Sequence, residues 1–197
     1  MNIPAKAMTN FFKFTADTFF AQRYGHRAVV LETVAAVPGM VGGMWSHFLS
    51  LRTMKRGYGP KIRTLLEEAE NERMHLMFFL EIAKPTWIER MIVVGAQIVF
   101  YVFYLFLYVF FRGTAHRMVA YFEEEAVNSY TSYLALIEEG VIEDVPAPQI
   151  AIDYYGMSSD ATLFDMVRNV RDDEMKHAKV NHAYANKAFN IKAKETN

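Results

Sequence analysis

Residues 68–76 read EAENERMHL and residues 171–177 read RDDEMKH, and each segment contains a glutamate followed three positions later by a histidine. These pairs are Glu72–His75 and Glu174–His177. Residues i and i+3 share one face of an α-helix, so each pair directs a carboxylate and an imidazole toward one point. Because apolar residues recur at helical spacing around both pairs, the sequence predicts two helices that each present two metal ligands.

Two single glutamates, Glu32 and Glu123, complete the pattern. Each replaces an apolar residue on the apolar stripe of a further helical segment. A lone Glu from each of two helices, with Glu-x-x-His from each of two others, is the ligand set of a di-iron or di-manganese site in a four-helix bundle. Four buried carboxylates would repel one another, and two divalent cations would balance their charge of −4. A single Glu-x-x-His helix could equally have these side chains on a solvated face, but the combined pattern favours a metal site.

Composition narrows the possible chemistry. The 197 residues carry a formal net charge of −1, so no overall field attracts nucleic acid, and we expect no nucleic-acid partner. The chain contains no cysteine, which excludes disulfides, thiolate metal sites and thiol-based regulation. Oxygen and imidazole ligands without thiolates favour iron or manganese over zinc. Hydrophobic residues make up 52% and aromatic residues 15% of the chain, more than a core of this size readily buries.

The chain reads as all-α, and we expect one domain over residues 1–197, a ferritin-like four-helix bundle with two added interfacial helices. An irregular link is expected over residues 140–159, with Ser158, Ser159 or Asp160 capping the helix that follows. The tail 189–197 is polar and expected to fray. Six helices are expected, at about 9–22, 24–55, 61–83, 87–111, 115–139 and 160–188.

The helix expected at 87–111 is apolar along most of its length and is long enough to cross a bilayer. It lies between Glu72 and Glu123, however, so a crossing would place two ligands of one site on opposite sides of the membrane. We therefore expect it to lie in one leaflet, with Arg90, Arg112 and Arg117 at the lipid headgroups. The Phe-rich segment within residues 1–23 is expected to be a second interfacial helix. Burial of both helices in a soluble oligomer is the alternative.

The chain resembles the alternative oxidase family, the cyanide-insensitive ubiquinol oxidases, over roughly residues 24–182. The resemblance rests on several specific segments. They are RYGHRAVVLETVAAVPGMVGGM (23–44), LLEEAENERMHLM (65–77), AKPTWIERM (83–91), EEEAVNSYT (123–131), VPAPQIAIDYY (145–155) and RDDEMKHAKVNH (171–182). It implies a di-iron protein bound to one membrane leaflet, usually a homodimer, that oxidises ubiquinol and reduces dioxygen to water without pumping protons.

The resemblance also implies roles for individual residues. Two iron ions would be held by Glu32, Glu72, His75, Glu123, Glu174 and His177. Tyr130, seven residues after Glu123, matches the family's redox-active tyrosine; a buried tyrosine that only hydrogen-bonds a ligand is the simpler alternative. The ubiquinol pocket would include Arg27, Leu31, Glu125, Ala126 and Ser129. Ligand-orienting positions correspond to Asn71, Asp173, Asn181 and His182.

Three departures from the family pattern stand out. Tyr155 takes a position where many members have Trp, and Ser129 takes one where Thr is frequent. Members with a regulatory cysteine respond to 2-oxo acids, and this chain has no cysteine to support such control. The N-terminal residues lack signal-peptide and transit-peptide character, which favours a bacterial or a processed form. The expected location is the inner membrane, on the cytoplasmic face in a bacterium or the matrix face in a mitochondrion.

Two other functions compete with this interpretation. A di-iron hydroxylase of quinone biosynthesis would share the ligand set and the membrane docking but would insert oxygen into a ring. An iron-storage or purely structural helical bundle would need a polar exterior, and the apolar segment 87–111 argues against it.

Overall fold

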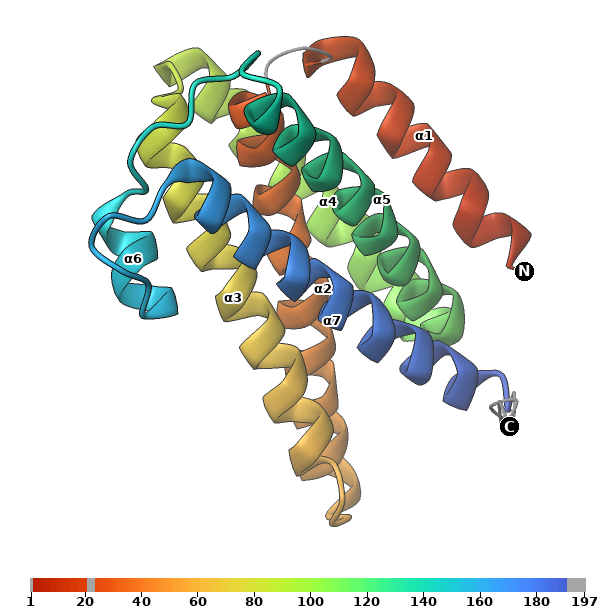
Figure 1. Ribbon diagram of the computed structural model, residues 1–197. Helices are drawn as coiled ribbons and strands as arrows, with labels where there is room; N and C mark the ends of the chain where they lie inside the picture. Colours follow the sequence, from red (N-terminus) through yellow and green to blue (C-terminus); the bar gives the residue numbers. More distant parts are fainter. Residues whose placement is uncertain (1, 21–23, 191–197) are drawn as a thin grey trace, which may run out of the picture. The chain divides into compact units, whose positions relative to one another are not determined.

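The computed structural model describes residues 2–20 and 24–190, without the side chains of residues 12–20, 24–27 and 30. Within these ranges the chain is all α, with no β-strand (Figure 1), so the all-α prediction is confirmed. The helices are α1 (Ile3–Phe20), α2 (Tyr24–Thr53), α3 (Gly59–Ala83), α4 (Trp87–Phe110), α5 (Arg112–Glu138), α6 (Gln149–Tyr155) and α7 (Leu163–Ala188).

The chain forms two compact units. Residues 15–115 form one, which we call the α2–α4 unit; the first 14 residues and residues 116 onward form the other, the α5–α7 unit. The expectation of a single domain stays a prediction. Each unit contains one of the two Glu-x-x-His pairs.

Most helix boundaries lie within a few residues of the predicted ones, and the differences have local causes. The first helix begins at Ile3 rather than near Thr9, because the Asn2 side chain accepts a hydrogen bond from the backbone N–H of Ala5 at 3.2 Å and so caps the first turn. α2 continues through Pro38 as one helix. The turn predicted after α2 is present between Thr53 and Gly59.

The predicted irregular link over residues 140–159 is wrong for the segment that forms α6. The Gln149 side chain donates to the Asp153 carboxylate at 2.7 Å, one turn along this helix, and Gly156 ends it with φ of 62°. The predicted caps of the next helix are also wrong. α7 starts after Thr162, whose backbone N–H donates to the Asp165 carboxylate at 3.2 Å.

Glycines allow α2 and α3 to approach closely along the hairpin that they form (Figure 1). A Cβ atom added at Gly39 would lie 2.9 Å from the backbone nitrogen of Ala69 and closer still to the carbonyl oxygen of Leu65. An alanine at Gly39 would therefore push the two helices apart. This contact lies two turns from Glu32 on α2 and one turn from Glu72 on α3, so it fixes the separation of two candidate ligands.

α4 begins with a reciprocal cap, in which Thr86 and Glu89 hydrogen-bond each other's backbone N–H groups. It packs against α2, yet only 22% of its most apolar window is buried. By length and composition, this helix and the stretch Leu31–Thr53 of α2 could each cross a membrane. The large apolar residues that α4 leaves exposed are Trp87, Ile88, Met91, Ile92, Val94, Ile98, Val99, Val102, Phe106 and Phe110.

Candidate metal centre

The α2–α4 unit brings together Glu32, Glu72 and His75. Glu72 and His75 come from successive turns of α3, and Glu32 comes from α2. The Nδ1 atom of His75 lies 3.5 Å from Oε2 of Glu32 and 3.6 Å from Oε2 of Glu72. One ligand atom from each residue lies within 4.8 Å of those of the other two, and the three residues are 2%, 0% and 0% exposed. We call this set cluster A.

The α5–α7 unit brings together Glu123, Glu174 and His177, which we call cluster B. Glu174 and His177 lie on one face of α7, and Glu123 comes from α5. One ligand atom from each lies within 4.8 Å of those of the other two. All three side chains are at least nine-tenths buried. Each cluster therefore has the same composition, two carboxylates and one imidazole.

The buried stripe of α7 explains how cluster B is positioned. Met166, Val167 and Val170 are fully buried on the face that continues to Glu174 and His177. One turn further, the Asn181 amide donates to the backbone carbonyl of His177 at 3.2 Å. Its oxygen therefore faces Nδ1 of His116 on α5, 2.9 Å away, so Nδ1–H of His116 donates. Asn181, predicted to orient ligands, thus connects α7 to α5 through a buried histidine.

His182 takes part in a second connection between the same two helices. Its Nδ1 lies 2.6 Å from Nη1 of Arg117, and its Nε2 lies 2.7 Å from a carboxylate oxygen of Glu124. Because a guanidinium only donates, Nδ1 accepts and Nε2–H donates to Glu124. Both ring nitrogens are engaged, so His182 contacts Arg117 and Glu124 rather than a cluster residue.

Arg117 also donates to the Asn186 side chain on α7. It is half-buried between the two helices, and the expectation that it anchors to lipid headgroups stays a prediction. The sequence pattern shows only that Arg117 follows an apolar helix. It cannot show that its hydrogen-bond partners, His182 and Asn186, lie some 65 residues further along the chain. Arg90 is exposed at the start of α4, and Arg112 is the first residue of α5.

The two other ligand-orienting candidates lie next to cluster residues in the sequence. Asn71 is half-buried on α3, beside Glu72. The Asp173 carboxylate, beside Glu174, accepts hydrogen bonds from the Tyr155 hydroxyl at 2.9 Å and from the Lys176 ammonium at 2.7 Å. The bond to Asp173 raises the pKa of Lys176. Tyr155 occupies the position where many family members have Trp. A tryptophan N–H could also donate a hydrogen bond to the Asp173 carboxylate.

Tyr130 lies on α5, two turns after Glu123, and is 4% exposed. Its neighbour one turn on, Tyr133, is also buried, and this burial raises the pKa of the Tyr133 phenol. Helical side chains lean toward the N-terminus, which directs the Tyr130 phenol back along α5 toward Glu123.

The five predicted ubiquinol-pocket residues divide between the units. Leu31 is half-buried on α2, and Glu125, Ala126 and Ser129 are half-buried on α5. The side chain of Arg27 lies outside the part of the chain that the structure describes. None of the four residues whose side chains the structure describes lines the groove described next.

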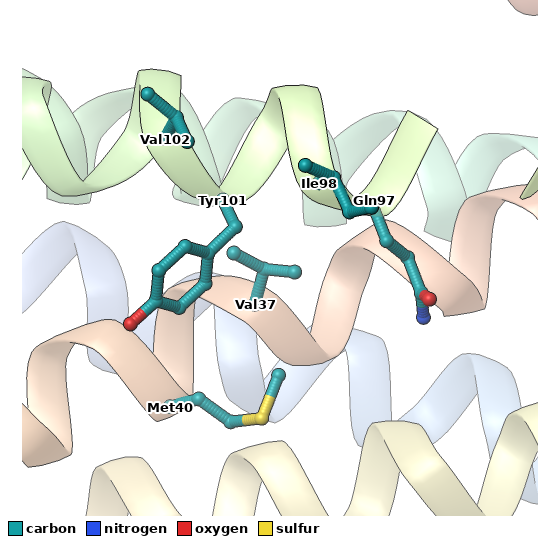
Figure 2. A pocket seen from close by; sticks show the side chains of 6 residues that line it. All are labelled: Val37, Met40, Gln97, Ile98, Tyr101 and Val102. Atoms are coloured by element: carbon teal, nitrogen blue, oxygen red, sulfur yellow. The ribbon is translucent and has the colours of Figure 1, made fainter. Parts of the chain in front are cut away.

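An open groove of about 260 Å³ lies between α2 and α4 (Figure 2). Two polar side chains of α4 reach from it toward α2: Gln97 Nε2 donates to the carbonyl oxygen of Thr33 at 3.2 Å, and the Tyr101 hydroxyl lies 3.7 Å from the Met44 sulfur. Sequence reasoning missed this contact beside Glu32, although Gln97 is the one amide in the apolar stretch of α4. The groove is lined by Val37, Met40, Gln97, Ile98, Tyr101 and Val102.

The donor chemistry of both clusters suits a divalent metal ion. Two buried carboxylates in an apolar interior are unfavourable without a cation, and one divalent ion in each cluster would balance their charge. Carboxylate oxygen with imidazole nitrogen suits iron or manganese, and the chain has no thiolate to favour a softer ion. Each cluster can therefore hold a metal ion by burial, charge and ligand type.

Comparison with known proteins gives one consistent family. A family model described as alternative oxidase matches residues 2–186. Ubiquinol oxidase 1c, mitochondrial, from Arabidopsis thaliana is 55% identical over 175 residues, which cover 89% of this chain and 53% of that protein. Ubiquinol oxidase 1a, mitochondrial, from Oryza sativa subsp. japonica is 56% identical over 170 residues, 86% of this chain and 51% of that protein.

A fungal ubiquinol oxidase is also similar to this chain. The mitochondrial ubiquinol oxidase of Batrachochytrium dendrobatidis is 50% identical over 183 residues, 93% of this chain and 58% of that protein. The chain spans about half the length of the curated relatives it matches.

Proposed function

Because the chain belongs to the alternative oxidase family, we propose that it is a non-electrogenic ubiquinol oxidase, which oxidises ubiquinol and reduces dioxygen to water. Two ubiquinol molecules supply the four electrons and four protons that convert one dioxygen into two waters. The observation that carries the proposal is the duplicated ligand set, since each unit buries two glutamates and one histidine with ligand atoms within 4.8 Å.

In this proposal clusters A and B together form one carboxylate-bridged site for two iron ions. Four glutamates supply −4, which matches two Fe(II) ions, and the ligand set is that of the di-iron helical bundles. Iron, when bound, supplies the redox chemistry that exchanges electrons with dioxygen. The buried helix faces around the clusters exclude bulk water, which strengthens every electrostatic interaction of the ligands.

Tyr130 is the proposed redox tyrosine. Its phenol is buried and lies on the Glu123 face of α5, so it can release or take up one electron and one proton at its hydroxyl oxygen. Arg27, Leu31, Glu125, Ala126 and Ser129 are proposed to bind the ubiquinol headgroup. There the Glu125 carboxylate would accept a hydrogen bond from a quinol hydroxyl, and Arg27 would donate to its oxygen.

The proposed location is one leaflet of the inner membrane, where a long-tailed quinol is available. The exposed apolar stripe of α4 supports docking without crossing, because an interfacial helix keeps one face in lipid and one on protein. We propose that the enzyme acts as a homodimer there, on the matrix face in a mitochondrion or the cytoplasmic face in a bacterium.

Oxygen uptake by the purified, iron-loaded protein tests this function directly. With a short-tailed ubiquinol, we expect uptake that cyanide does not inhibit, with two quinols oxidised for each dioxygen and unmodified quinone as product. A hydroxylated quinone in the product would identify the competing hydroxylase. Absence of quinol-dependent uptake in protein with full iron content would refute both functions.

A further inference from the structure

The turn of the α2–α3 hairpin is strongly basic. Residues 52–63 contain five basic residues, and residues 33–66 contain no aspartate or glutamate. In a chain of net charge −1, this concentration at one end of a hairpin is unusual. The basic residues are Arg52, Lys55, Arg56, Lys61 and Arg63.

Four of these charges are directed to solvent rather than to protein carboxylates. Arg52, Lys55, Arg56 and Arg63 are exposed, and none forms an ion pair with a residue that the structure describes. A cluster of unpaired like charges destabilises the free protein through self-repulsion. An anionic surface facing these residues would offset this repulsion.

Apolar side chains surround the basic residues at the end of α2. Phe48 is 58% exposed, Leu51 is 74% exposed and Met54, which ends the helix with φ of 50°, is 90% exposed. Exposed apolar side chains interleaved with basic ones are the composition of a surface that inserts between lipid headgroups. A nucleic-acid or soluble acidic partner would account for the charges but not for these apolar residues.

The hairpin end is continuous with the exposed apolar stripe of α4. Lys61 and Arg112 both lie against the Tyr108 ring near the end of α4, with Nζ and Cζ 5.6 and 5.5 Å from its centroid. Further back, Met40 of α2 lines the same groove as Ile98 of α4 (Figure 2). No acidic residue occurs over residues 90–115 of α4 and the start of α5, so the apolar stripe of α4 carries no negative charge that would oppose an anionic surface at the hairpin end.

We propose that the end of the α2–α3 hairpin, residues 48–63, binds anionic lipid headgroups. It is a second membrane contact that makes docking depend on lipid charge as well as on the apolar stripe of α4. The inference rests on the membrane docking in the proposed function, to which it adds the chemistry of the lipid. Basic residues close to an anionic surface each strengthen binding several-fold, and the effect weakens as salt increases.

Vesicle binding by the full-length protein tests the proposal without an enzyme assay. The vesicles are phosphatidylcholine with or without phosphatidylglycerol, and binding is followed by flotation at low and high salt. We expect stronger binding to the anionic vesicles. Lys55→Gln/Arg56→Gln should weaken that binding about 25-fold, since two charges contribute roughly fivefold each. The matched control is Lys179→Gln/Lys187→Gln, which removes two exposed charges from α7 and should bind as the parent does.

Several outcomes would overturn the proposal. Equal binding to neutral and anionic vesicles would refute the headgroup inference and leave the proposed docking intact. Equal losses in the two variants would show a non-specific charge effect. A change in oligomer mass, without a change in vesicle binding, in Lys55→Gln/Arg56→Gln would assign the hairpin end to a subunit interface. Failure of the parent protein to bind either vesicle would refute the membrane docking itself.

Discussion

The Nδ1 atom of His75 lies 3.5 Å from a carboxylate oxygen of Glu32, although the two residues belong to different helices. The contact depends on the register of α2 against α3, which the close approach at Gly39 sets. The geometry of cluster A therefore depends on the packing of α2 against α3 as well as on the ligand residues. Substitutions can test the packing and the ligands separately.

Replacing Gly39 tests the packing. Gly39→Ala places a Cβ against the backbone of Leu65 and Ala69, so we expect a loss of about 1–3 kcal/mol in the free energy of unfolding. Gly95→Ala on α4 is the matched control, because a Cβ atom there meets nothing within 4 Å. Its free energy of unfolding should increase by roughly 0.5–1 kcal/mol. Chemical denaturation measures both. Equal effects of the two variants would contradict the packing argument.

Removing one ligand tests metal binding. Parent protein should contain two iron ions per chain, and Glu123→Ala should lose both the iron and the oxidase activity, because four carboxylates are needed to balance two Fe(II). Glu138→Ala changes an exposed glutamate of the same helix and should retain both properties. Metal analysis of each preparation, beside oxygen uptake, makes the comparison. One iron or none in an active preparation would refute the stoichiometry.

Arg117 is expected to contribute to stability rather than to lipid binding. Arg117→Ala removes the hydrogen bonds to His182 and Asn186 that connect α5 to α7, and should reduce the free energy of unfolding by about 1–3 kcal/mol. The control, Arg73→Ala, removes an exposed pair with Glu70 and should change it by roughly 1 kcal/mol at most. Thermal unfolding distinguishes the two. If Arg117→Ala left stability unchanged but weakened vesicle binding, the headgroup role would hold instead.

Tyr130→Phe separates a redox tyrosine from a structural one. If the phenol only donates a hydrogen bond, its removal should slow turnover about ten- to a hundredfold at most, the equivalent of roughly 1–3 kcal/mol. If the phenol takes part in electron transfer, turnover should fall to background while iron content and helical circular dichroism stay unchanged. Near-normal ubiquinol oxidation by this variant would end the redox proposal.

The topology of α4 can be tested with introduced cysteines, since the chain contains none. Lys84→Cys and Asn128→Cys place single thiols at exposed positions before and after this helix. If α4 lies in one leaflet, a membrane-impermeant maleimide should label both from the same side of sealed vesicles. Labelling from opposite sides would mean that α4 crosses the membrane and that the proposed single site is divided.

The sequence was sufficient for the long helices and for the shared face of each Glu-x-x-His pair, because both follow from a local period. Glu72 and His75 share a face by spacing alone, and apolar residues at helical intervals mark every long helix. It was insufficient wherever a partner is distant in the chain. The hydrogen bond from Gln97 to the Thr33 carbonyl and the bonds from Arg117 to His182 and Asn186 join residues some 65 positions apart. The short helix α6 was missed because seven residues between a proline and a glycine give too few turns for a period to be visible.

The central claim is that clusters A and B form one site for two iron ions, and magnetic spectroscopy of the iron-loaded protein tests it most directly. Mössbauer and electron paramagnetic resonance spectra report whether two iron ions share bridging ligands. We predict two iron ions per chain in a single magnetically coupled pair, and loss of the coupled signal in Glu123→Ala. Two uncoupled mononuclear iron signals per chain would mean that each cluster binds its own ion separately, and would contradict the account.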